Sequence, residues 1–227
     1  MYSILDIDLD YFNQVPDAAR RLEQLLHWAA CPVSMVVERH NHAFGRWRKR
    51  WRRNNIAPSH ILHVDEHHDM MDQRQQANIG NFMFHAMRIW PRCRVHWLVQ
   101  CPIDSPAMWL ADETWDSVRS RFSHGPRRPA RWPKPDVVSV CTSPDFVVPH
   151  LAAELMNVLA EFITDDHKDK MPNRVAGGIS PRPPHHPACG SALGGSQGLL
   201  GGPGTGRVVT LTPPSSLTFS SIILLRT

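Results

Sequence analysis

The stretch Ile61-Leu62-His63-Val64-Asp65-Glu66-His67-His68-Asp69 joins a short apolar run to a run of polar, metal-ligating side chains. The apolar run predicts a buried strand that ends near Asp65. Alternate side chains on an extended segment point the same way, so we expect Asp65, His67 and Asp69 to converge. Two carboxylates and an imidazole gathered at the end of one strand indicate a metal site.

Two further segments of the chain repeat this arrangement after their own apolar runs. They are Asp6-Ile7-Asp8-Leu9-Asp10 and Glu38-Arg39-His40-Asn41-His42. Together the three segments hold enough negative charge for two divalent ions about 3.5–4 Å apart. A ligand set rich in carboxylates, with few imidazoles and no thiolate, favours Mn(II) over structural zinc. We therefore predict a binuclear site with two Mn²⁺ per chain.

Short apolar segments alternate with helical patterns before residue 170. The expected strands are Tyr2–Leu9, Pro32–Glu38, His60–Asp65, Arg94–Gln100 and Asp136–Cys141. The expected helices are Asp17–Trp28, Ala43–Arg53 and Pro149–Ile163. This alternation predicts an α/β fold, a three-layer α/β/α arrangement around a mainly parallel sheet. In such sheets ligands bind beyond the carboxyl ends of the strands, which is where all three polar segments fall.

The composition changes near residue 170. Residues 171–227 contain 10 of the 13 glycines and 8 of the 20 prolines, without helical or strand periodicity until the last few residues. We expect residues 1–170 to form a metal-dependent hydrolase-like domain, and residues 171–227 to be a disordered tail or an aberrant reading of the message. No run reaches the roughly 18 apolar residues of a membrane span, and no signal peptide is evident, so we expect a cytoplasmic protein.

The three polar segments resemble motifs of the arginase/deacetylase (ureohydrolase) superfamily. Val64 to Asp69 is similar to its Asp-x-His-x-Asp segment, Leu5 to Phe12 to its Asp-x-Asp strand, and Val36 to His40 to the strand that supplies a further histidine. The residues of the three segments, taken together, are most similar to a branch of bacterial peptide arginases and animal relatives. The Asp-x-Asp segment comes last in arginases and first here, as in a circular permutation.

The resemblance implies a ligand set and leaves one register open. One ion would be held by His40, Asp65, Asp69 and one aspartate of the first strand, and the other by His67, Asp65 and two aspartates of that strand. Either Asp8 and Asp10 or Asp6 and Asp8 supply the first strand's ligands, and the small polar residue that precedes the arginase pair favours Asp8 and Asp10.

The implied reaction converts arginine, within a peptide or as another small guanidino compound, to ornithine and urea. A carboxylate must hold the guanidinium, and Glu38 and Asp145 are the candidates. His85 is the counterpart of the expected histidine proton shuttle. Competing interpretations are another metal-dependent hydrolase, such as a deacylase or a phosphatase, and a non-catalytic binding protein.

A basic run, Arg46-Trp47-Arg48-Lys49-Arg50-Trp51-Arg52-Arg53, supports the last of these interpretations. Arginine interleaved with tryptophan can bind nucleic acid. Trp47 and Trp51 lie four residues apart, however, and share a helical face with Phe44, which favours a crossover helix with its aromatic side chains in the core. We therefore do not expect a nucleic-acid partner; an acidic peptide and a homo-oligomer stay open.

Overall fold

A computed structural model describes residues 2–164 as one six-stranded, all-parallel sheet flanked by helices. The strand order is β2-β6-β1-β3-β4-β5. The strands are β1 (Tyr2–Asp8), β2 (Val33–Val37), β3 (Pro58–Val64), β4 (Arg94–Leu98), β5 (Phe122–Gly125) and β6 (Val137–Cys141). The predicted α/β class and parallel sheet are confirmed. The expected tail, residues 171–227, lies outside the described residues.

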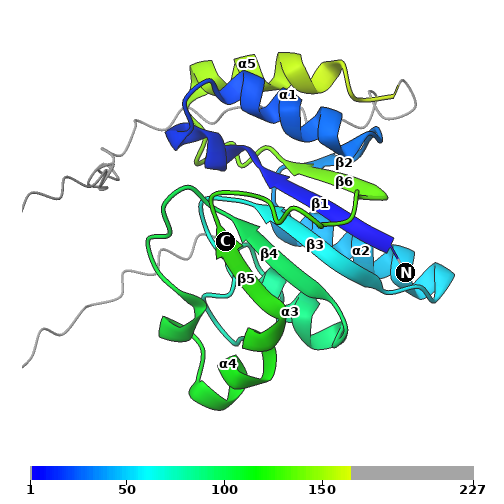
Figure 1. The fold of residues 1–227 in the computed structure, drawn as a ribbon, viewed down its shortest axis with the longest axis vertical. Helices are drawn as coiled ribbons and strands as arrows, with labels where there is room; N and C mark the ends of the chain where they lie inside the picture. The colour runs from blue at the N-terminus through cyan, green and yellow to red at the C-terminus, as the bar shows by residue number, and fades with distance from the viewer. Residues whose placement is uncertain (1, 165–227) are drawn as a thin grey trace, which may run out of the picture. The chain divides into compact units, whose positions relative to one another are not determined.

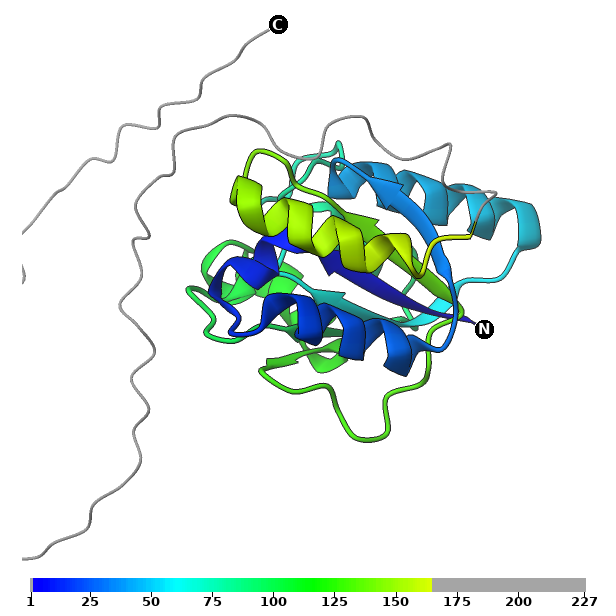
Figure 2. The same cartoon turned by 90° about the horizontal axis from the view of Figure 1, so that it is seen from above.

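The helices lie on both faces of the sheet (Figure 1). The α-helices are α1 (Ala18–Ala29), α2 (His40–Asn54), α3 (Phe82–Ile89), α4 (Asp112–Val118) and α5 (Pro149–Ala160). The short 3-10 helices are η1 (Leu9–Gln14), η2 (Pro106–Met108) and η3 (Arg119–Arg121). Figure 2 shows α1 and α5 running side by side over one face, and α2 lies with α3 on the other.

Alternate side chains of the central strand β1 point to opposite faces of the sheet, so the strand contributes to a hydrophobic core on each face. Leu5 and Ile7 of β1 pack with α1 and α5, whereas Ile4 packs with α2 and α3. Every residue of β1 is buried, which is expected for the middle of a parallel sheet covered on both faces. Because Asp6 and Asp8 follow Ile4 at intervals of two, they face the side of the sheet that carries α2 and α3.

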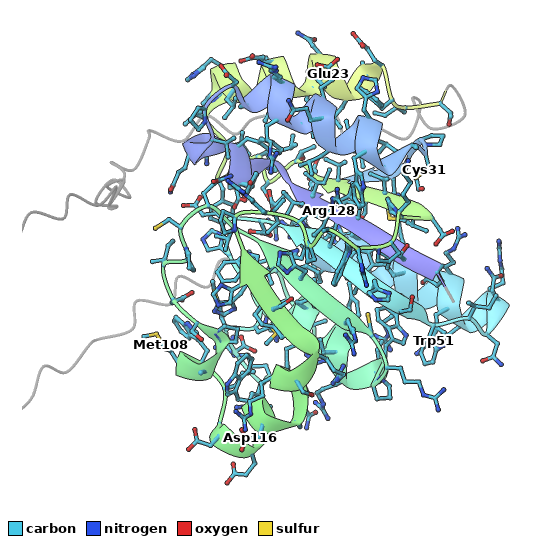
Figure 3. The ribbon with its side chains drawn as sticks, viewed as in Figure 1. Glu23, Cys31, Trp51, Met108, Asp116 and Arg128 are labelled. Atoms are coloured by element: carbon cyan, nitrogen blue, oxygen red, sulfur yellow. The ribbon has the colours of Figure 1, made fainter. Side chains whose placement is uncertain are left out.

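Helix α2 connects β2 to β3 and separates aromatic from cationic side chains. Phe44 and Trp47 are buried, and the rings of Trp47 and Phe82 lie 6.0 Å apart. Trp51 is half-buried with its ring 6.1 Å from that of Trp90. Figure 3, in which Trp51 and Glu23 of α1 are labelled, places the two side chains on opposite sides of the sheet. The aromatic residues of the basic run therefore belong to the core.

Among residues 2–164, no helix has the length and apolar character needed to cross a bilayer.

Candidate metal centre

The candidate metal centre lies at the carboxyl ends of neighbouring strands. In the sheet register, Asp6 of β1 stands between His63 of β3 and Ser139 of β6. The His63 Nδ1 and Asp6 Oδ2 atoms are 3.0 Å apart, and Ser139 Oγ donates to Asp6 Oδ1 at 2.9 Å. All three side chains are fully buried. They form a polar layer directly beneath the end of the sheet.

Asp65, the first residue after β3, occupies the middle of the cluster. Its Oδ2 lies 3.1 Å from His40 Nδ1 and 3.5 Å from His63 Nε2. Its Oδ1 lies 3.5 Å from His67 Nδ1 and accepts a hydrogen bond from the His67 backbone N–H at 2.7 Å. The Trp97 indole N–H donates to the Asp65 carbonyl at 2.9 Å. These contacts fix both the backbone and the carboxylate of Asp65.

The residues form overlapping groups that could each hold an ion. One group is His40, Asp65 and Asp69, another is Asp10, Asp65 and His67, and within each group the ligand atoms lie within 4.8 Å of one another. A further group joins Asp8 and His40 to Cys141. Asp65 belongs to the first two groups, so its carboxylate is placed to bridge two ions.

The aspartates in and after β1 lie at different depths beneath the end of the sheet. Asp8 and Asp10 line a cavity at the end of the sheet, whereas Asp6 is not among its lining residues. Asp6 contacts His63 and Ser139, and its Oδ2 lies 3.6 Å from His40 Nε2. Asp8 Oδ1 accepts from the Asp10 backbone N–H at 3.0 Å, which caps helix η1 and holds Asp8 at the strand end. The geometry favours Asp8 and Asp10 over Asp6 and Asp8 as ligands.

Local backbone features place the remaining ligands. His40 is the first residue of α2 and is buried against Phe82 with ring centroids 4.8 Å apart. Asp69 adopts a left-handed conformation with φ of 50°, which aspartate tolerates better than most residues. The Asp69 carbonyl accepts from the backbone N–H groups of Met83 and Phe84 at 3.1 and 3.4 Å, and so joins the loop to the start of α3.

The buried charges shift one another's pKa values strongly. Burial and the charge of Asp65 raise the pKa of Asp69 to about 7 and contribute to a pKa of about 6 for Asp10. Burial works against protonation of His67, but hydrogen bonds to Asp10 and Asp65 raise its pKa to about 12. Asp65 moves the other way: burial opposes ionisation, yet the neighbouring histidines hold its pKa below the usual range. The bare cluster therefore retains protons at neutral pH.

The donor set suits divalent cations. Within residues 2–164, the buried atoms Asp10 Oδ1 and His40 Nε2 have no hydrogen-bond partner, although unpartnered buried polar atoms are expensive. Carboxylates and imidazoles in this ratio are typical of Mn(II) sites, and positive ions would replace the retained protons. The residues therefore fit divalent metal ions.

A cavity of about 290 Å³ opens above these ligands. Its remaining lining includes two carboxylates predicted from the sequence, Glu38 and Asp145, and the cation Arg39. Apolar side chains also line it, and two of them are largely exposed: Ile79 at 43% and Phe146 at 55%. The cavity thus combines a polar floor with a partly apolar rim.

His85 does not line the cavity. It lies on α3, and its Nε2 pairs with the carbonyl oxygen of Arg74 at 2.9 Å. Burial lowers the pKa of His85 below its ordinary value. The structure therefore does not bring the predicted proton shuttle to the ligands. Residue spacing does not define the path of the loop before α3, and that loop directs His85 to the Arg74 carbonyl instead.

Two residues at the site were not selected from the sequence. Ser143 Oγ donates to Asp8 Oδ2 at 2.5 Å, and Cys141 stands beside Asp8 in the sheet register. Both fall at the carboxyl end of β6, just where the rule that located the other segments would place ligands. A search beyond acidic and histidine residues at each strand end would have found them.

Comparison with protein-family models, with curated proteins and with solved structures finds no match to this chain. The resemblance to ureohydrolases therefore depends on the three sequence segments alone.

Proposed function

We propose that the chain is a binuclear metal-dependent hydrolase that releases urea from the guanidinium group of arginine, with Mn²⁺ as the metal. The observation that carries the proposal is the position of Asp65, shared by two ligand groups on the floor of a cavity that also contains uncommitted carboxylates. Two divalent ions held 3.5–4 Å apart are a recurrent arrangement in hydrolases, at roughly the spacing that one bridging carboxylate allows.

His40, Asp65 and Asp69 would hold one ion, with Asp8 beside them, and His67, Asp65 and Asp10 the other. When bound, the ions supply an activated water near neutral pH and a Lewis acid. The chain's own residues orient the ligands: the Asp65 carbonyl is fixed by Trp97, and Asp8 by Ser143.

Glu38 and Asp145 supply the negative charge that a guanidinium requires. Both line the cavity although they are far apart in the sequence, and neither belongs to a ligand group. A carboxylate binds a guanidinium through paired, charge-assisted hydrogen bonds and so fixes its plane as well as its position. We assign substrate binding to these two residues.

The rim supports arginine within a peptide as the substrate. Free arginine carries a charged ammonium and a carboxylate next to its side chain, whereas a peptide residue carries neutral amides and apolar neighbours. Ile79 and Phe146 at the rim offer apolar contact surface to such neighbours.

The test is an assay of the full chain, reconstituted with Mn²⁺, on arginine-containing peptides and on free arginine. Urea release, together with the mass change from arginine to ornithine in the peptide, is the expected result. Asp65→Asn should abolish it, whereas Asp116→Asn, a change of an exposed aspartate on α4, should leave it unchanged. Hydrolysis of aryl phosphates or acyl-lysine peptides without urea release would contradict the proposal.

A further inference from the structure

A groove on the outer side of α2 adjoins the metal cavity and carries positive charge. It is lined by the end of β2 and the first half of α2, including Val36, Val37, Gly45, Arg46 and Lys49. Glu38 lines both this groove and the metal cavity, so the two are adjacent at that residue. Whatever occupies the groove therefore lies next to the cavity mouth.

Within the described part of the chain, the arginine and lysine cations of α2 have no acidic partner in an ion pair. The helix contains six arginine or lysine residues, and the sequence has no acidic residue between Glu38 and Asp65. Among residues 2–164, the ion pairs that involve arginine or lysine join Arg74 to Asp72 and Arg119 to Asp116, and none involves α2. Arg46 and Lys49 are exposed, and Glu38 is the one carboxylate among the described residues that line the groove, so the groove presents net positive charge to solvent.

We propose that this groove binds an acidic segment of polypeptide, and that the segment belongs to the peptide substrate. This inference depends on the proposed function for the identity of the substrate, but the groove's affinity for acidic peptide does not. Charge complementarity would supply steering and specificity, and a segment held beside Glu38 would present its neighbouring residues to the cavity at high effective concentration.

The shape of the groove favours a peptide. A helical glycine usually weakens a helix, yet a Cβ at Gly45 would meet no atom within 4 Å, so the missing side chain leaves open space along the groove floor. Beside it, Val36 and Val37 at the end of β2 provide apolar wall. The groove therefore offers apolar wall and open space to a peptide, and Arg46 and Lys49 to its acidic side chains.

Nucleic acid and membrane are less suited to this surface. Single-stranded nucleic acid needs exposed aromatic rings for stacking, whereas Trp47 is buried and Trp51 packs against Trp90. A membrane-binding helix needs an exposed apolar face, and the apolar residues of α2 face the core.

Direct binding tests the proposal without requiring turnover. A short fluorescein-labelled peptide of alternating Glu and Gly is titrated with the metal-free full chain, and its Gln counterpart serves as the charge control. We expect the Glu peptide to bind and the Gln peptide not to bind. The dissociation constant of the Glu peptide should be about tenfold higher for the double variant Arg46→Glu with Lys49→Glu. The matched variant Arg52→Glu with Arg53→Glu makes the same charge change on the same helix outside the groove, and should raise the constant by no more than about twofold.

A further variant separates shape from charge. Gly45→Gln adds a neutral side chain to the groove floor, improves helix propensity and should weaken peptide binding as the Arg46 and Lys49 changes do. Equal weakening by both charge variants, no effect of Gly45→Gln, or tighter binding of an oligothymidylate or anionic vesicles through the same residues would overturn the proposal. If the chain binds the peptide but releases no urea, the groove would be supported as a peptide-binding site and the proposed enzymatic function would be rejected.

Discussion

Asp6 and Asp8 lie two residues apart on β1 and have different neighbours. Asp8 lines the cavity and belongs to a ligand group, whereas Asp6 is enclosed by His63 and Ser139. We predict that Asp8→Asn weakens the binding of one ion at least about 100-fold, since removing a ligand exceeds the effect of its outer-shell partners. Metal content measured by mass spectrometry after equilibration checks this.

Asp6→Asn is the matched substitution on the same strand. It should leave the metal content unchanged and reduce the free energy of unfolding by roughly 1–3 kcal/mol, because His63 and Ser139 lose a charged acceptor. Denaturant titration measures the loss. Loss of metal from Asp6→Asn as well as from Asp8→Asn would instead show that the other register, Asp6 with Asp8, supplies the ligands.

Proton release should make ion binding depend on pH. His67, with a pKa of about 12, keeps its proton throughout the neutral range and must lose it to bind an ion. Asp69 and Asp10, with pKa values of about 7 and 6, take up further protons as the pH falls. We therefore predict that Mn²⁺ affinity rises with pH, by about tenfold per pH unit for each displaced proton, and most steeply below pH 7.

Electron paramagnetic resonance titration of free Mn²⁺ at several pH values measures this dependence. Calorimetry in two buffers of different ionisation enthalpy counts the protons released on binding. An affinity that does not change between about pH 6 and pH 8 would rule out the protonated cluster described above.

At the scale of elements, α2 depends on its aromatic face. Trp47 is fully buried and lies against Phe44 and Phe82. Trp47→Ala should reduce the free energy of unfolding by about 3–5 kcal/mol, as for other buried aromatic truncations. Met108→Ala, at a side chain that is 75% exposed, should change it by no more than about 0.5 kcal/mol. Denaturant unfolding followed by circular dichroism compares the two; similar losses would contradict the assignment of Trp47 to the core.

Elements with strong apolar patterns were predictable, and short ones were not. The five predicted strands occur within two residues of their expected ends, because buried parallel strands read as continuous apolar runs. Strand β5 has four residues at the sheet edge, only partly buried, and leaves no such run. Helix α3 (FMFHAMRI) has only eight residues, about two turns, which is too short a segment to establish a helical period from the sequence.

The ligands of the candidate site were predictable from apolar runs, but their neighbours in the sheet were not. Asp8, His40 and Asp65 were selected because each follows an apolar run, and the sheet brings those run ends together. The partners of these ligands arise from cross-strand register: Ser139 meets Asp6 only because β6 inserts between β1 and β2. That strand order could not be read from spacing along the chain.

At the scale of the whole molecule, the sheet places its least favourable charges where an ion can compensate them. Asp6, Asp8, Asp10, Asp65 and Asp69 are all at least 95% buried, close to one another at one edge of the sheet. Without ions, protons on the carboxylates and histidines offset part of this repulsion. The folded state should therefore bind divalent ions far better than the unfolded chain does, and binding should stabilise it.

We predict that Mn²⁺ raises the unfolding temperature of the full chain. Each site contributes about 2.7 kcal/mol when the free ion is at 100 times its dissociation constant, so two sites contribute roughly 5 kcal/mol, or about 10–20 °C for a domain of this size. Differential scanning calorimetry with Mn²⁺ and with chelator measures the shift. Asp65→Asn removes the ligand common to both groups, so its unfolding temperature should respond little to Mn²⁺. If instead the variant gained as much stability as the wild type, the ions would be binding elsewhere and Asp65 would not be their shared ligand.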